Sequence, residues 1–324
     1  MSADPAWSGW NGSDDRARAA LRHDAYSYDD ADGYVTDLLG FVRGGLACDE
    51  PVLIAVPGPN LALLHAGLSV REAAQVRMRD MAVSGRNPGR ILGSVLTAFV
   101  HEHPGHRVRI ISEAIWPDRS DEEYLACVEH EALINIALAD APAHIVCPYD
   151  RTNLPPRVLT DATRTHPTLA WGCQRRDSPS YGDPRAVAAG FDPPLSALPE
   201  DAEVVVVNTA TGPRTARQLA HEVGEGLGLP PHRLTDLRIA VHELATNTIL
   251  HAGGNGLLSI WKAGNDLVVQ IDDGGRITDP LVGRRPPRPS EIGHGLYVVH
   301  QVADLVRVHR TGDGTSVRAY FRHT

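Results

Sequence analysis

Short apolar runs alternate with segments of helical periodicity through the first half of the chain. Each run is continuous and only a few residues long, which is typical of strands buried on both faces of a sheet. The runs that we expect to be strands are PVLIAVPG (51–58), VRIISEAIW (108–116) and AHIVCPYD (143–150). The segments that we expect to be helices are 32–47, 61–68, 89–103 and 122–140. Because strands that alternate with helices form parallel sheets, this pattern predicts an α/β domain.

The composition changes between residues 173 and 202, where proline, aspartate and serine are frequent, as at a boundary between domains. The pattern beyond it predicts a sheet with helices on one face. The elements expected there are a strand at 203–208, helices at 212–228 and 231–253, a hairpin at 257–275, a helix at 293–306 and a strand at 314–321. The whole chain then divides into a mobile arm at 1–20, a first domain at 21–172, a linker at 173–202 and a second domain at 203–324.

The charge and the apolar content of the 324 residues exclude some classes of protein. A net charge of −9 and a pI of about 5.9 argue against a protein whose main partner is nucleic acid. No apolar run reaches the roughly 18–20 residues of a membrane span, and the N-terminus lacks the apolar region of a signal peptide, so we expect a cytoplasmic protein. The cysteines at 48, 127, 147 and 173 form no CxxC pair, which favours reduced thiols over a zinc site or a disulfide.

A stripe of polar side chains runs along the helix expected at 231–253. Glu243, Asn247 and His251 recur every fourth residue, so they lie on one face of the helix. The amide oxygen of Asn247 is a suitable ligand for Mg²⁺, and Glu243 can accept a proton from an attacking hydroxyl. His251 can equally pack behind such a site.

Two further motifs follow the stripe in the order that a nucleotide site requires. Asp272, at the end of an expected strand, can accept a hydrogen bond from the amino group of adenine, and Gly274 lets a planar base approach the backbone. Gly293 and Gly295 expose N–H groups at a helix N-terminus, which is a natural phosphate site. The cationic side chains available to neutralise phosphate charge are Arg284, Arg285 and Arg288.

The order ExxxN, HA, DxG, GxGL and a terminal GT resembles the GHKL ATPases, which share the Bergerat α/β sandwich fold and bind ATP with Mg²⁺. The stretch ELATNTILHA, with a short interval before GHGL, looks most like the RsbW-type anti-sigma factors that are serine kinases. The resemblance implies the following roles: Glu243 as general base, Asn247 as Mg²⁺ ligand, Asp272 on the adenine amino group and Thr315 beside the adenine. Arg276 stands where the family's DxGxG pattern has its last glycine.

The first domain resembles the MEDS domain, the sensory domain named for DcmR, from about residue 23 to 171. The segments that carry the resemblance are GRNPGR (85–90), SEAIWPDRS (112–120), EHEALIN (129–135), CPYD (147–150) and THP (165–167). The family is thought to sense small organic molecules, and the resemblance implies a RecA-like parallel α/β fold without a working P-loop. Residues 51–67 stand where we expect the phosphate loop, yet they contain neither GxxxxGKS nor GxxxxGKT, so we expect no ATP there.

Open α/β sheets bind ligands beyond the carboxyl ends of their strands. The candidates for a sensory pocket at that edge are Glu113, Trp116, Arg119, His130, Glu131, Cys147 and Tyr149. A structural role is an equal alternative for several of them, because polar helix residues and a small buried thiol are ordinary features of a domain.

A sensory domain joined to an ATPase domain resembles the actinobacterial anti-sigma factors that act by partner switching. The resemblance implies two partners, a sigma factor and a STAS-domain anti-anti-sigma protein, with serine phosphorylation of the latter, a small-molecule ligand on the first domain and homodimerisation. Two alternatives stay open: a nucleotide-gated binding module that sequesters a partner without phosphoryl transfer, and a two-component histidine kinase with His221 as phosphoacceptor.

Overall fold

The computed structural model describes residues 20–172, 174–208, 212–286 and 294–323. The chain divides into two compact units, Met1–Ala189 and Gly190–Thr324, and each is described by itself. The arm expected at 1–20 and the candidate Gly293 lie outside the described residues, apart from residue 20. Across the described ranges, every helix is too short or too polar to cross a bilayer.

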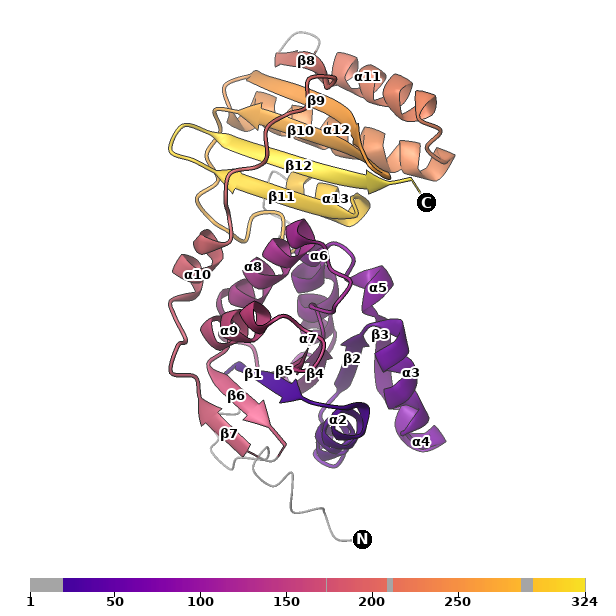
Figure 1. The fold of residues 1–324 in the computed structure, drawn as a ribbon, viewed down its shortest axis with the longest axis vertical. Helices are drawn as coiled ribbons and strands as arrows, with labels where there is room; N and C mark the ends of the chain where they lie inside the picture. The colour runs from indigo at the N-terminus through magenta and orange to yellow at the C-terminus, as the bar shows by residue number, and fades with distance from the viewer. Residues whose placement is uncertain (1–19, 173, 209–211, 287–293, 324) are drawn as a thin grey trace. The chain divides into compact units, whose positions relative to one another are not determined.

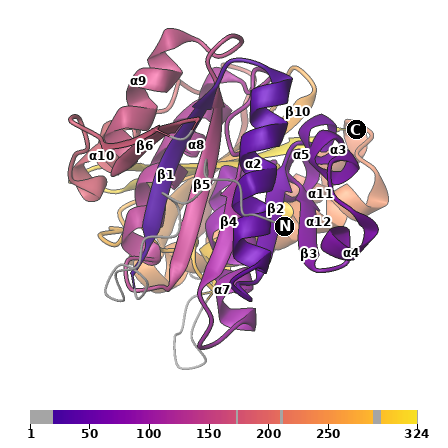
Figure 2. The same ribbon diagram turned by 90° about the horizontal axis from the view of Figure 1, so that it is seen from below.

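The first unit contains a seven-stranded sheet in the order β3-β2-β4-β5-β1-β6-β7, and Figure 2 shows several of these strands side by side. All neighbours are parallel except β7, which runs antiparallel to β6. The strands are β1 (Arg22–Tyr28), β2 (Val52–Val56), β3 (Val76–Asp80), β4 (Val108–Ser112), β5 (Ala143–Asp150), β6 (Thr168–Trp171) and β7 (Gln174–Asp177). The expectation of a parallel α/β sheet is therefore confirmed.

Helices connect the parallel strands, and one more helix follows β7 (Figure 1). They are α2 (Ala31–Leu46), α3 (Gly58–Ala66), α4 (Val70–Ala73), α5 (Met81–Ser84), α6 (Pro88–Ile91), α7 (Ala98–Glu102), α8 (Asp121–Ala137), α9 (Pro156–Thr165) and α10 (Pro184–Gly190). The helix expected at 89–103 is interrupted by one π-helical segment, Leu92–Thr97. Ser120 begins α8 with a capping box, in which its hydroxyl accepts from the N–H of Glu123 and its own N–H donates to the Glu123 carboxylate.

Strand β1 lies between β5 and β6 in the sheet, although the sequence contains no apolar run there. Its polar residues are tolerated because they are paired: buried Asp24 accepts from His144 Nε2 at 2.6 Å and from Arg175 Nη2 at 2.5 Å. The chain leaves β1 toward β2 and leaves β5 toward β6, so the topological switch point lies between β1 and β5. The turn after β1, at that point, is formed by Asp29 and Asp30. The position of a phosphate loop in this fold is therefore this turn, and not residues 51–67 as expected from the sequence.

The second unit is an antiparallel five-stranded sheet in the order β11-β12-β10-β9-β8, and its helices cover one face (Figure 1). The strands are β8 (Glu203–Asn208), β9 (Asn255–Ala263), β10 (Asp266–Asp273), β11 (Leu305–Arg310) and β12 (Thr315–Arg322). The helices are α11 (Gly212–Gly226), α12 (Pro231–His251) and α13 (Gly295–Val302). The helix expected at 293–306 ends at Val302, because Ala303 turns to extended backbone and the chain then enters β11.

A strap formed by residues 191–196 is tied to β11 and β12, within the segment expected to be linker. Arg307 on β11 donates to the carbonyl of Phe191 at 3.1 Å, and the backbone N–H of Arg310 donates to Asp192 at 3.1 Å. Arg318 on β12 donates to the Ser196 hydroxyl at 2.7 Å and to its carbonyl at 2.6 Å. The strap is therefore part of the second unit.

We predict that Asp24→Asn lowers the free energy of unfolding by about 3 kcal/mol, because it removes the buried charge that pairs with Arg175 and His144. Asp29→Asn is the control: the Asp29–Arg151 pair is half exposed, and its loss costs less than about 1 kcal/mol. Urea unfolding of each variant, followed by circular dichroism, measures both values. Equal effects of the two substitutions would contradict the prediction.

Candidate functional site

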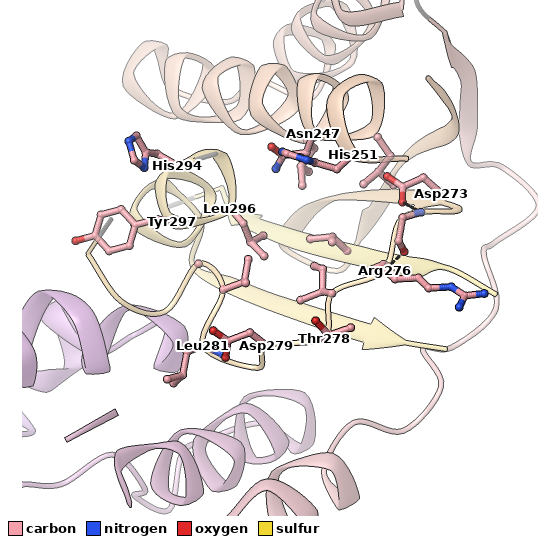
Figure 3. A pocket seen from close by; sticks show the side chains of 18 of the residues that line it. Asn247, His251, Asp273, Arg276, Thr278, Asp279, Leu281, His294, Leu296 and Tyr297 are labelled. Atoms are coloured by element: carbon pink, nitrogen blue, oxygen red, sulfur yellow. Dashed lines mark hydrogen bonds between the residues drawn. The ribbon is translucent and has the colours of Figure 1, made fainter. Parts of the chain in front are cut away.

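A cavity of about 500 Å³ lies in the second unit between α12, α13 and the end of β10 (Figure 3). Helix α12 begins with Pro231 at its first position and buries Leu237, Val241 and Leu244 against the sheet. That packing turns Asn247 and His251 toward the cavity. The other residues that line the cavity include Asp273, Gly275, Arg276, Thr278, Asp279, Arg285, His294, Leu296, Tyr297 and Thr315.

Glu243, Asn247 and Gly295 come together beside this cavity. A methyl group placed on Gly295 would lie 2.8 Å from Asn247 Oδ1 and 2.9 Å from Glu243 Oε2, so any larger residue would collide with both side chains. The first turn of α13 therefore approaches α12 as closely as a glycine permits. This proximity brings Gly295, the described glycine of the GxG motif, to the polar stripe of α12.

Four residues form a chain of hydrogen bonds at the other end of the cavity. Thr248 Oγ1 donates to Asp273 Oδ2 at 2.6 Å, and the N–H of Gly275 donates to Asp273 Oδ1 at 2.9 Å. Thr315 Oγ1 then donates to the carbonyl of Gly275 at 2.7 Å. Asp273 and Thr315 are directly opposite each other on β10 and β12. This network holds one carboxylate at the cavity wall.

Asp272, the expected adenine partner, projects from the opposite face of β10, because successive strand residues alternate between faces. Its carboxylate accepts from Gln270 Nε2 at 2.9 Å and from Ser316 Oγ at 2.5 Å. It does not line the cavity, whereas Asp273 does. Gly274 is likewise exposed and away from the cavity, and Gly275 is the glycine that lines it. The residues of this motif that line the cavity are thus Asp273 and Gly275, each one position after the residue expected from the sequence.

Three of the described arginines near the site occupy different environments, and the candidate Arg288 lies outside the described residues. Arg276 is exposed and lines the cavity directly after Gly275. Arg285 also lines it, with Nη2 at 3.5 Å from Asp279 Oδ2. Arg284 is buried and is absent from the cavity wall, so only Arg285 of this expected pair is placed to meet a ligand.

The candidates in the first unit fall into separate groups. Glu113, which follows β4, accepts from Tyr34 at 2.9 Å and from Asn60 at 2.9 Å. The guanidinium carbon of Arg119 lies 3.6 Å from the centre of the Trp116 ring, while its nitrogens donate to backbone carbonyls.

Glu131 and Cys147 meet on the face of the sheet covered by α8, and two histidines that we did not anticipate join them. Cys147 Sγ lies 3.4 Å from Glu131 Oε2, and both are buried together with His23 and His166. The Tyr149 ring stands edge-on to the His166 ring, with centroids 5.6 Å apart. His130 is buried on the same helix. His166 belongs to the THP segment of the sequence, but His23 lies on a strand that the pattern does not reveal.

Comparison with known families accounts for both units. Residues 22–167 match the profile of the methanogen/methylotroph DcmR sensory domain, MEDS, and residues 207–321 match the histidine kinase-like ATPase domain. The chain joins a MEDS domain to a histidine kinase-like ATPase domain. No curated protein matches it significantly. Among solved structures, the RsbU and RsbW domains of Rv1364c from Mycobacterium tuberculosis are 17% identical, with 38% of this chain and 33% of that chain covered and a TM-score of 0.30. The match thus spans about a third of that chain.

The cavity of the ATPase domain has the donors that a magnesium nucleotide needs. Mg²⁺ takes oxygen ligands. The amide oxygen of Asn247 lies where Gly295 of α13 comes close to α12, next to the Glu243 carboxylate. The Asp273 carboxylate faces the cavity at its other end, where an amino group of a base can donate to it. An ATPase domain implies nucleotide binding, and these residues fit it.

Glu113 makes the MEDS domain sensitive to pH. Burial raises the pKa of Glu113 from 4.5 to about 7, against the lowering effect of its hydrogen bonds from Asn60 and Tyr34. The folded domain therefore holds a proton that the unfolded chain releases near pH 4.5. The contribution of this bound proton to the free energy of unfolding is fully present below pH 4.5 and is lost as the pH rises to about 7.

We predict that the free energy of unfolding falls by about 3 kcal/mol between pH 4.5 and pH 7 through Glu113 alone. Glu113→Gln, which cannot ionise, removes this part of the pH dependence. Urea unfolding at a series of pH values in wild type and variant measures the difference. Parallel pH profiles would show that Glu113 ionises normally in the fold.

Proposed function

We propose that the protein is a cytoplasmic anti-sigma regulator that binds ATP with Mg²⁺ and phosphorylates a STAS-domain partner on serine. The observation that carries the proposal is the convergence of Glu243 and Asn247 on Gly295, at one end of a cavity whose other end is closed by Asp273. A proton acceptor, an oxygen ligand for a cation and a base-binding carboxylate are thereby arranged along one site. A small molecule on the MEDS domain would shift the balance between partners only if it binds the two states unequally.

The residues of the site have separable tasks in this proposal. Glu243 accepts the proton of the attacking serine hydroxyl, as the aspartate of other phosphoryl-transfer sites does. Asn247 orients its amide oxygen toward the cation. When bound, Mg²⁺ offsets the charge of the phosphate oxygens. Asp273, held by Thr248 and Gly275, receives the amino group of adenine.

We predict that Asp273→Asn weakens ATP binding about 10- to 100-fold, the value of a hydrogen bond to a charged group. Asp272→Asn, one residue earlier on the other face of β10, leaves the affinity unchanged. Calorimetric titration with ATP and Mg²⁺ gives both dissociation constants. A larger loss of ATP affinity in Asp272→Asn than in Asp273→Asn would show that Asp272, the residue indicated by the motif, binds the adenine amino group.

We predict that Glu243→Gln lowers the rate of phosphoryl transfer to a STAS protein about 100- to 10,000-fold while ATP still binds, because a general base acts only on the reacting hydroxyl. Glu225→Gln on α11, whose side chain is 72% exposed, serves as the control and keeps full activity. Transfer of the γ-phosphate from labelled ATP is the measurement. Full transfer by Glu243→Gln would exclude it as the base.

A nucleotide-gated binding module is the second candidate function, and Arg276 is the observation that favours it. This arginine lines the cavity directly after Gly275, so its large side chain can restrict the loop that closes over the phosphates. ATP binding without transfer in the wild type, together with transfer in Arg276→Gly, would establish the gated module. Transfer by the wild type supports the kinase.

A histidine kinase is the weakest candidate. His221 lies on α11 within the ATPase domain, where its Nε2 is 3.8 Å from Glu225 Oε2 and its side chain is 44% exposed. A phosphorylated imidazole is labile to acid, whereas phosphoserine is stable. Acid treatment of the labelled proteins therefore separates the two chemistries.

A further inference from the structure

Four buried side chains of the MEDS domain meet at one point between the sheet and its helices. His23 comes from β1, Cys147 from β5, Glu131 from α8, and His166 from the residue that ends α9. One nitrogen, sulfur or oxygen atom from each lies within 4.8 Å of all the others, and none of the four residues is more than 2% exposed.

Four of the six separations between the ligand atoms match the edges of a small coordination tetrahedron. His23 Nε2 lies 3.3 Å from Cys147 Sγ and 3.3 Å from Glu131 Oε2. Glu131 Oε2 lies 3.4 Å from Cys147 Sγ and 3.4 Å from His166 Nε2. A tetrahedral ion with bonds of about 2.0–2.3 Å to nitrogen, oxygen and sulfur places its ligand atoms about 3.3–3.7 Å apart.

Both imidazoles are oriented by a hydrogen bond on the far side of the ring. His23 Nδ1 lies 3.1 Å from Asn135 Oδ1, and the Asn135 amide is itself fixed because its Nδ2 donates to the Thr165 carbonyl at 2.7 Å. His166 Nδ1 lies 3.0 Å from the Ala162 carbonyl. Each Nδ1 therefore carries the proton, and each Nε2 turns its lone pair toward the common centre, as in metal sites whose outer partners set the tautomer.

One nitrogen in the group has no hydrogen-bond partner among the described residues. His166 Nε2 is fully buried and makes no hydrogen bond, although it faces Glu131 at 3.4 Å. Buried polar atoms are nearly always satisfied, so an unsatisfied lone pair directed at a carboxylate and a thiol calls for a cation.

We propose that His23, Glu131, Cys147 and His166 bind a divalent transition-metal ion of the zinc class. The combination of two imidazoles, one sulfur and one carboxylate is the donor chemistry that selects such ions over Mg²⁺ or Ca²⁺. Four protein ligands leave no open position, so the ion is held as in a structural site and not as in a hydrolytic one. It would connect β1, β5, α8 and the end of α9, elements that are otherwise far apart along the chain.

The test uses the full-length protein, freed of metal with a chelator, refilled with Zn²⁺ or Co²⁺ and dialysed. Elemental analysis gives the number of ions per chain. Cobalt adds a spectroscopic readout, because a thiolate ligand produces a charge-transfer band and tetrahedral geometry produces intense d–d bands. We expect one ion per chain and both features in the wild type.

Cys147→Ser is the decisive variant, and Cys48→Ser, at an exposed cysteine, is its control. We expect Cys147→Ser to lose the charge-transfer band and to bind Zn²⁺ more than about 100-fold less tightly, beyond the effect of removing an outer partner. Cys48→Ser keeps the wild-type stoichiometry and spectrum.

Glu131→Gln preserves the volume of the side chain and removes its charge, so it covers the case in which Cys147→Ser fails to fold. Its fold is checked by circular dichroism, and we expect weakened Zn²⁺ binding and altered d–d bands with the charge-transfer band retained. A wild-type protein that takes up no metal overturns the proposal. So does a cobalt spectrum unchanged in both Cys147→Ser and Glu131→Gln.

Discussion

The hydrogen bond from Thr248 to Asp273 joins the longest helix of the ATPase domain to its sheet, and the geometry of the cavity depends on it. Thr248 is fully buried, so its hydroxyl and the Asp273 carboxylate fix the distance between α12 and the end of β10. Asn247, the residue before Thr248 on α12, and Glu243, one turn before Asn247, are then brought to Gly295. The same carboxylate orders Gly275, and through it Thr315 on β12. A single residue thus positions both ends of the site.

Much of this site is predictable from the sequence because its parts are local. A spacing of four residues on a helix is sufficient to place Glu243 and Asn247 together, and a GxG before a helix locates Gly295. The choice between Asp272 and Asp273 was not predictable from the motif. Adjacent strand residues point to opposite faces, and only the register of β10 against β12 decides which of them shares a face with Thr315.

The first domain shows where sequence patterns carry little information. Strand β1 is central, yet its side chains alternate between His23 and Ala25 on one face and Asp24 and Tyr26 on the other. Each face buries its own polar cluster, so the segment lacks the apolar run that predicts a buried strand. The metal site that we propose would escape the cysteine spacing for a similar reason. Its four candidate ligands come one at a time from four elements, and no local motif records that arrangement.

The strap at 191–196 allows the connection between the domains to transmit force to the ATPase domain. A free tether sets only the local concentration of one domain around the other. Here Asp192 and Ser196 are bound to Arg310 and Arg318, so the chain enters the ATPase domain as an extra layer on β11 and β12. Arg318 also donates to Gln270 on β10, two residues before Asp272. Movement of the strap would therefore exert a force on β10 and β12, the strands that carry Asp273 and Thr315.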